Sequence, residues 1–216
     1  MFMRCDELIP IVPDWIWGSE RALWFAGVRL RVRTTVLRFS DGGVLIHSPA
    51  PPTESGLSAL RELGNVRYLL VPNCFHHLAT PALAKALPSA KVIGPASEAA
   101  KNPALRIDLD IHSLSDGVGL PGLSCIPLFG VPFLDETLVY HSPTGTLVGA
   151  DVAIRADSRD HWTWRIAARL TWCYERLSVP PDVRKKIEDR TLVAASFRRV
   201  QAFEVRRLIV AHGGDP

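Results

Sequence analysis

The chain has 216 residues, of which 47% are hydrophobic and 22% are charged, and this predicts a single domain with one sizeable core across residues 1–216. The formal net charge of +3 is too small to predict a nucleic-acid partner, and no apolar run approaches the roughly 18 residues of a membrane span. We expect a protein that acts on a small molecule, with no nucleic-acid or membrane partner. The oligomeric state stays open.

The compartment is predicted from the N-terminus and the cysteines. The opening sequence MFMRCDELIPIVPDWIW lacks the long apolar core and the small-residue cleavage site of a secretory signal. Four cysteines lie far apart, with no Cys-x-x-Cys spacing that would indicate a zinc knuckle or a redox motif; they are Cys5, Cys74, Cys125 and Cys173. We therefore expect a cytoplasmic protein with free thiols.

The first half of the chain predicts strands and then alternating helices and strands. Turn residues at Gly27 and at Ser40-Asp41-Gly42 each separate two β-rich runs. In chain order we predict strands at 22–25, 28–32, 34–39 and 43–47, a helix at 53–63, a strand at 68–71, a helix from 81 to 87 with Thr80 as its N-cap, a strand at 91–93 and a helical turn at 97–101.

The second half returns to short strands and ends in helices. The sequence Ser142-Pro-Thr-Gly145 predicts the turn of a hairpin. We predict strands at 123–128, 137–141 and 146–149, helices at 162–177, 181–189 and 192–205, and a last strand at 207–211. This order favours an α/β sandwich of two mixed sheets with helices outside over a single doubly wound sheet.

Metal-binding residue types recur where predicted strands end. They are His47, His76 and His77, Asp151, and His212, after four different strands. Ligands in α/β folds lie beyond the carboxyl ends of the strands. If these ends meet, imidazole and carboxylate groups converge as they do around zinc or non-haem iron.

Each candidate also has an ordinary structural interpretation. Asp151 is as well explained as a cap of the loop after its strand, and His212 as a turn residue in the sequence AHGG. His47 fits best as a residue at the edge of the core or beside the ligands. Adjacent loop histidines such as His76 and His77 are common without a chemical role.

The predicted hairpin also determines which nearby residues can lie close to Asp151. His141 lies at its turn end, whereas Asp151 lies at the other end, about 16 Å away at about 3.3 Å per residue, so His141 is excluded from the site. Asp135 and Glu136 precede the first strand and lie near Asp151. They are spare carboxylates, either as ligands or as partners that orient a histidine.

The order of these motifs resembles the metallo-β-lactamase fold superfamily. The resemblance rests on a strand ending in LIHSP, the sequence PNCFHHL, the run ETLVYHSPTGTLVGAD and the closing AHG, and it covers nearly the whole chain. It implies a four-layer αββα sandwich that hosts hydrolases and some oxidoreductases. The family motif His-x-His-x-Asp-His is only partly present, which implies a divergent branch with a degraded metal motif.

The resemblance implies which ligands remain. His77 matches the last histidine of the motif, Asp151 the bridging aspartate and His212 the final histidine, while His76 replaces the motif's aspartate. These four residues are the expected metal ligands, with His77 favoured over His76, for at most one zinc or iron ion per chain.

The same matching implies that the family's first metal site is lost. Pro72 and Cys74 stand at the two leading histidines, and the later histidine falls near Val131, where there is none. His47 replaces the aspartate of the Asp-Thr-Gly strand end. A two-metal clamp that activates water between ions is therefore in doubt.

Three functions follow from these residues. The first is a one-metal hydrolase, in which the metal lowers the pKa of water and Asp151 or Glu136 orients or deprotonates that water. The second is a non-catalytic relative that binds a small molecule or a protein, with Trp162, Trp164 and Trp172 as interface anchors, although core packing explains these tryptophans as well. The third, an iron oxidoreductase, is the weakest. Basic residues after Pro181 hint at an anionic substrate, although a solvated helical face explains them too.

Overall fold

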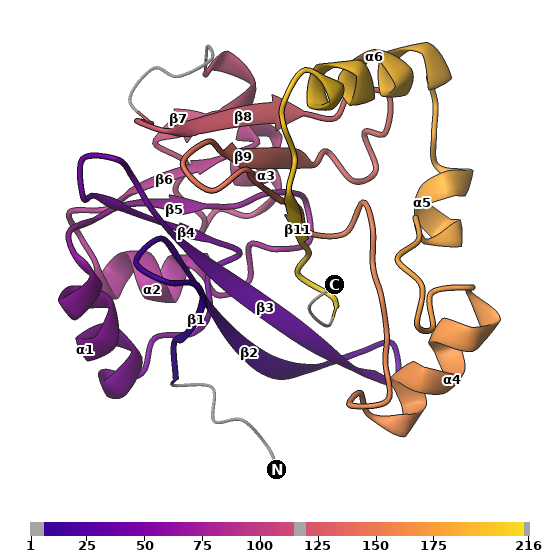
Figure 1. Cartoon of the computed structure of the whole chain (residues 1–216), viewed down its shortest axis with the longest axis horizontal. Coiled ribbons are helices and arrows are strands. Elements are labelled where there is room, and N and C mark those ends of the chain that lie inside the picture. Colours follow the sequence, from indigo (N-terminus) through magenta and orange to yellow (C-terminus); the bar gives the residue numbers. More distant parts are fainter. Residues whose placement is uncertain (1–6, 115–119, 214–216) are drawn as a thin grey trace.

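Two β-sheets packed face to face form the centre of the molecule in the computed structural model, which describes residues 7–114 and 120–213 (Figure 1). The expectations for the first six residues, including Cys5, lie outside the described residues. None of the helices in the described part of the chain has the length and apolar character needed to cross a bilayer.

The larger sheet has the strand order β1-β2-β3-β4-β5-β6-β7 among the described residues. Its strands are β1 (Ile9–Val12), β2 (Ile16–Phe25), β3 (Val28–Arg38), β4 (Val44–His47), β5 (Val66–Leu70), β6 (Lys91–Gly94) and β7 (Leu109–Asp110). The strands from β1 to β4 pair antiparallel, and those from β4 to β7 pair parallel. The carboxyl ends of β4 and β5 therefore lie at the same edge, where His47 pairs with Leu70.

The smaller sheet has the order β11-β10-β9-β8 in the same part of the chain. Its strands are β8 (Leu123–Pro127), β9 (Thr137–His141), β10 (Thr146–Val148) and β11 (Arg207–Ile209). The predicted hairpin of β9 and β10 is present, and His141 pairs with Thr146 at its turn end, away from Asp151 as predicted. The parallel pair β10 and β11 brings the residues after both strands together.

Helices cover the outer faces of both sheets. Helix α1 (Glu54–Leu63) and helix α2 (Thr80–Ala86) place Leu60 and Leu83 against Ile46 on the outer face of the larger sheet. Helix α6 (Arg190–Gln201) places Val200 against the outer face of the smaller sheet (Figure 1). The other helices are α3 (Ala96–Lys101), the 3-10 turn η1 (Ile111–Ser113), α4 (Trp162–Leu170) and α5 (Pro181–Lys185). The fold is the predicted αββα sandwich.

Strand alternation explains where the core lies. In β4, Leu45 points between the two sheets toward Val139 and Val148, whereas Ile46 points outward to the helices. Each fully buried aliphatic side chain of this kind contributes about 1.5–3 kcal/mol to folding. Because side chains alternate, His47 lies on the inter-sheet face like Leu45, at the edge where β4 ends.

Most predicted elements are present, with some differences at their ends. Helix α1 begins one residue later than predicted, because Thr53 is its N-cap and its side chain accepts a hydrogen bond from the Gly56 N–H. The predicted Thr80 cap is wrong, since α2 begins at Thr80 and its N-cap residue Ala79 has no side-chain hydrogen bond. The two strands predicted between residues 28 and 39 are one strand, β3.

The predicted helix at 162–177 is too long. Helix α4 ends at Leu170, and Trp172 has a left-handed backbone with φ of 63°. The next residues turn back and form isolated bridges to Ile154 and Ala156. The buried Trp164 packs in the core, as the ordinary interpretation expected, whereas Trp162 and Trp172 are exposed.

Candidate metal centre

Three side chains from separate parts of the sequence meet where three strands end. His76 follows β5, Asp151 follows β10 and His212 follows β11. The two carboxylate oxygens of Asp151 lie 3.2 Å from Nε2 of His76 and 3.1 Å from Nε2 of His212. One candidate ligand atom from each residue lies within 4.8 Å of the other two. We refer to His76, Asp151 and His212 as the three-ligand group.

Asn73 shapes the loop that carries His76. Its Oδ1 atom accepts hydrogen bonds from the backbone N–H groups of Phe75 and His76, at 2.9 and 3.0 Å. Its Nδ2 atom donates to Asp151 and to Glu136, at 2.8 and 3.0 Å. Sequence reasoning missed this buried residue. The available signal was an asparagine directly after a strand and a proline, a position that favours a side-chain-stabilised turn.

The Nδ1 atoms of both histidines are already engaged by the protein. Nδ1 of His76 hydrogen-bonds to Oγ of Ser48, and Nδ1 of His212 donates to the carbonyl oxygen of Arg31 at 2.9 Å. Their Nε2 atoms face Asp151. Metal-binding histidines are commonly oriented in this way, with one ring nitrogen held by the protein and the other turned to the ion.

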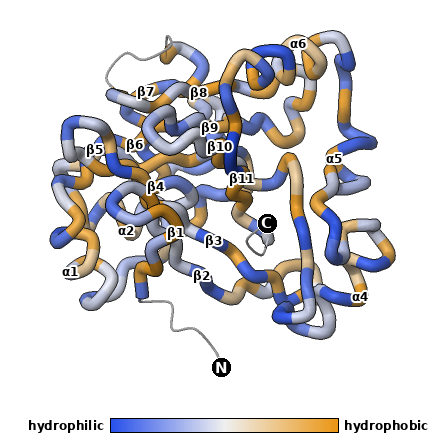
Figure 2. Tube along the Cα trace, viewed as in Figure 1, coloured by the Kyte–Doolittle hydropathy of each residue, from blue (hydrophilic) through white to orange (hydrophobic). Residues whose placement is uncertain are grey.

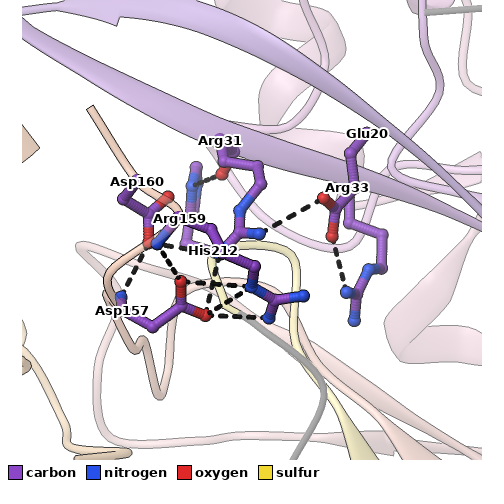
Figure 3. A network of polar contacts seen from close by, with 7 residues as sticks. All are labelled: Glu20, Arg31, Arg33, Asp157, Arg159, Asp160 and His212. Atoms are coloured by element: carbon purple, nitrogen blue, oxygen red, sulfur yellow. Dashed lines mark hydrogen bonds and ion pairs between the residues drawn. The ribbon is translucent and has the colours of Figure 1, made fainter. Parts of the chain in front are cut away.

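A cluster of ion pairs supports the Arg31 side of the site (Figure 3). The Arg31 guanidinium lies 3.2 Å from Asp157, 3.1 Å from Asp160 and 3.5 Å from Glu20. Arg33 pairs with the same Glu20 at 2.6 Å. The backbone oxygen of Arg31 also accepts the hydrogen bond from His212. The ion pairs of the Arg31 side chain therefore help to keep β3 in the position that orients the His212 imidazole.

The charges of the three-ligand group stabilise one another. Burial raises the pKa of Asp151, but the two neighbouring imidazoles outweigh it and hold that pKa well below its usual range. Burial lowers the pKa of His212, but the hydrogen bond to Asp151 outweighs it and the net pKa is raised. The positive charge of protonated His212 thus lies beside Asp151, where a bound metal cation would also lie.

The donor set fits one metal ion. Two imidazole nitrogens and one carboxylate oxygen form the ligand set of several catalytic zinc sites and of ferrous sites with open positions. A fourth donor, the imidazole of His47, is near His76 and Asp151. His47 is 1% exposed, and neither of its ring nitrogens has a hydrogen-bond partner among the described residues. Burial and the neighbouring His76 lower its pKa to about 3, so the ring is neutral.

His77 is not part of the three-ligand group, contrary to the preference given to it over His76. Its Nδ1 atom lies 3.0 Å from the carbonyl oxygen of Cys74 and 3.8 Å from a carboxylate oxygen of Glu98. The tight turn set by Asn73 sends adjacent side chains in different directions, and His76 is the one that reaches Asp151. Whether any of these residues binds metal stays a prediction.

Glu136 stabilises the backbone around Asp151. Its carboxylate accepts hydrogen bonds from the N–H groups of Ala150, Asp151 and Val152 at 2.8 to 3.0 Å, in addition to the Asn73 amide. Burial and the charge of Asp151 raise its pKa to about 7. Glu136 therefore holds the backbone that carries Asp151, and whether it orients a ligand or acts on water stays a prediction.

The residues expected to mark a lost first site lie in unsuitable surroundings. Burial and a hydrogen bond to Glu98 raise the pKa of the Cys74 thiol to about 12, so the thiolate needed for ligation is disfavoured. Val131 packs with Leu134 and Val183 in an apolar cluster. Asp135 hydrogen-bonds or pairs with Ser97 and His112 instead of joining the three-ligand group.

The fold is similar to that of solved metallo-β-lactamases. A metallo-β-lactamase from Pontibacter korlensis is similar at 14% identity, with 97% of this chain and 93% of that chain covered and a TM-score of 0.63. The FIM-1 metallo-β-lactamase of Pseudomonas aeruginosa, in its mono-zinc form, is similar at 12% identity, with 96% and 88% covered and a TM-score of 0.60.

A flavodiiron core is similar as well. The metal-soaked Flv1 core of Synechocystis sp. PCC6803 matches at 13% identity over 96% of this chain and 56% of that chain, with a TM-score of 0.59. Residues 13–98 match the sequence model of a domain of unknown function, DUF4336. No curated protein is similar to this sequence. The chain has the metallo-β-lactamase fold.

Proposed function

We propose that the protein is a hydrolase that uses a single zinc or ferrous ion held by His76, Asp151 and His212. The observation that carries the proposal is the convergence of these residues, with both Nδ1 atoms held by the protein and both Nε2 atoms turned to the same carboxylate. Such a pre-oriented set is difficult to explain by packing alone.

The chain's own residues would do the following work. Ser48 and the carbonyl of Arg31 keep the two imidazoles oriented, and Asn73 keeps Asp151 in place. When bound, an ion at this position supplies a Lewis acid that lowers the pKa of water toward neutrality. Asp151 is the carboxylate nearest to that position and is ionised at neutral pH, so it would accept a hydrogen bond from the attacking water.

The substrate would be a small molecule with an apolar part and a negative charge. Phe75, next to His76, and Phe133 are partly exposed and have ring centroids 5.3 Å apart. The Lys186 ammonium lies 5.8 Å from the centre of the Phe133 ring. This surface supports an anionic substrate better than the helical charge pattern does.

The test is metal-dependent turnover. Protein stripped by a chelator and reloaded with one equivalent of zinc or ferrous iron is assayed on p-nitrophenyl acetate, an acyl thioester and p-nitrophenyl phosphate. We expect turnover of one class that needs the ion and falls at least about 100-fold in Asp151→Asn, with Asp41→Asn at the surface as the matched control. Full turnover in metal-free protein would contradict the proposal.

The alternative is a non-catalytic protein that binds a ligand or a partner. The apolar surroundings of Val131 and the protonated Cys74 support it, since they remove the residues that a two-metal site needs. A loaded protein that binds one ion tightly and hydrolyses none of the three compounds would favour this alternative. We keep a reducing cytoplasm as the proposed compartment, because Cys74, Cys125 and Cys173 are free.

A further inference from the structure

A recess lies between α5 and the segment that turns back after α4. It has a volume of about 420 Å³ and is lined by Trp172, Arg176, Leu177, Ser178, Val179 and Arg184. This volume is within the range of small-molecule pockets, about 300–1,000 Å³. None of the six residues belongs to the three-ligand group.

The wall of the recess is held by backbone hydrogen bonds. Ser178 exchanges two with Ile154, at 2.9 and 3.1 Å, and Ala156 bonds to Cys173 and Glu175 at 2.8 and 2.7 Å. The Ser178 hydroxyl donates to the carbonyl oxygen of Trp172 at 2.7 Å. The recess is therefore formed before any ligand arrives, which lowers the entropic cost of binding.

Trp172 is exposed just after the end of α4. It has a left-handed backbone with φ of 63°, and the Cys173 N–H donates to the Ala168 carbonyl oxygen at 2.8 Å, as in a common helix C-cap. The indole is 71% exposed, so its apolar surface is available to a ligand in the recess.

Two arginines line the recess. Within residues 7–114 and 120–213, neither Arg176 nor Arg184 forms an ion pair, even though Glu175 and Asp182 are close in sequence. An arginine fork matches the geometry of a carboxylate, sulfonate or phosphate. The recess thus combines positive charge with the apolar surface of Trp172 and Leu177.

The surface beside the recess is apolar as well. Trp162, Ile166 and Leu170 follow one another at four-residue spacing along α4, and all three are exposed, Leu170 at 77%. Figure 2 shows hydrophobic and hydrophilic positions alternating along α4 and α5 at this edge of the molecule.

We propose that the recess binds an organic anion with an apolar or aromatic body. Arg176 and Arg184 hold the acid group, and Trp172 and Leu177 contact the apolar part. This chemistry is shared by free amphiphilic acids and by anionic lipids. The site is independent of the metal centre and of the hydrolase proposal.

The test uses 8-anilinonaphthalene-1-sulfonate and, as its uncharged counterpart, N-phenyl-1-naphthylamine. We expect about one sulfonate bound per chain, with affinity at least about tenfold weaker in Arg176→Gln/Arg184→Gln. Binding of the uncharged amine should change less than about twofold in that variant and should weaken in Trp172→Ala. Arg61→Gln/Arg198→Gln, which removes the same charge from exposed positions on α1 and α6, is the matched control and should bind the sulfonate normally.

Equal sulfonate affinity in the two double variants would overturn the proposal, as would equal weakening of both probes in Arg176→Gln/Arg184→Gln. Sedimentation with phosphatidylglycerol or phosphatidylcholine vesicles identifies the source. Arginine-dependent binding to phosphatidylglycerol alone assigns the site to an anionic lipid, and absence of vesicle binding with retained sulfonate binding assigns it to a free acid. Metal content should be unchanged in every variant.

Discussion

Nδ1 of His212 lies 2.9 Å from the backbone carbonyl oxygen of Arg31, a residue 181 positions earlier in the chain. A carbonyl oxygen only accepts, so this contact places a proton on Nδ1 and leaves Nε2 as the nitrogen directed at Asp151. The side chain of Arg31 meanwhile pairs with Asp157 and Asp160 (Figure 3). One residue therefore links the position of a candidate ligand to the loop before α4.

The first prediction concerns this link. Arg31→Gln leaves the buried carboxylate of Asp160 without its guanidinium partner, whereas Asp157 keeps Arg159 at 2.8 Å. Breaking a buried pair in this way costs about 3–5 kcal/mol. Urea unfolding of the metal-free protein should show a loss of that size, and metal affinity should fall with it.

The matched control for Arg31→Gln is Arg67→Gln. Arg67 pairs with Asp41 at 2.7 Å, but both side chains are exposed and screened by water, so stability should change little. Similar losses of unfolding free energy in the two variants would mean that the Arg31 ion pairs stabilise the protein no more than an exposed pair does.

The second prediction separates an orienting role for Glu136 from a catalytic one. Glu136→Gln replaces one carboxylate oxygen by an amide, so fewer of the four N–H groups at residues 73 and 150–152 remain satisfied. We expect metal affinity to fall about 10- to 100-fold, as is typical when a residue that orients a ligand is changed. Competition with a chromophoric chelator measures this affinity. Unchanged affinity combined with lost turnover would instead restore the direct acid–base role.

The third prediction concerns the dependence of stability on pH. The unfolded chain protonates His47 below about pH 6.5, whereas the folded protein resists protonation down to about pH 3. The unfolded state therefore binds more protons in this window, and His47 lowers stability progressively as the pH falls through it. The difference in unfolding free energy between wild type and His47→Phe should change by up to about 1.4 kcal/mol per pH unit. A difference that is flat from pH 4 to 6.5 would show that water reaches His47.

The order and type of the elements were predictable because local signals agreed with the global fold. The helix at residues 53–63, apart from its first residue, and the turn at residues 142–145 were correct for this reason. The strand β3 was divided in the prediction between Val32 and Thr34, although Arg33 continues the alternation of Arg29 and Arg31. Arg33 is buried against Glu20, a pairing across strands that no local pattern reveals.

The sequence predicted which strand ends form the site. It did not predict which of the adjacent residues His76 and His77 faces Asp151. The match to the family motif favoured His77, because a motif match does not include the turn that the Asn73 side chain stabilises. The same limit applies to residues 171–177. Their sequence continues the helical pattern, but the helix ends before them and Trp172 has a left-handed backbone. In residues 171–178 the bridges to Ile154 and Ala156, far away in the sequence, hold the chain where it turns back.

The most direct test of the central claim is the metal content of four purified proteins: wild type, His76→Ala, His77→Ala and Asp151→Ala. Elemental analysis after dialysis against zinc or ferrous iron should give about one ion per chain in wild type and in His77→Ala, and almost none in the other two. Circular dichroism checks that all four proteins are folded. An ion retained by His76→Ala but lost by His77→Ala, or no ion in folded wild type, would contradict the three-ligand group.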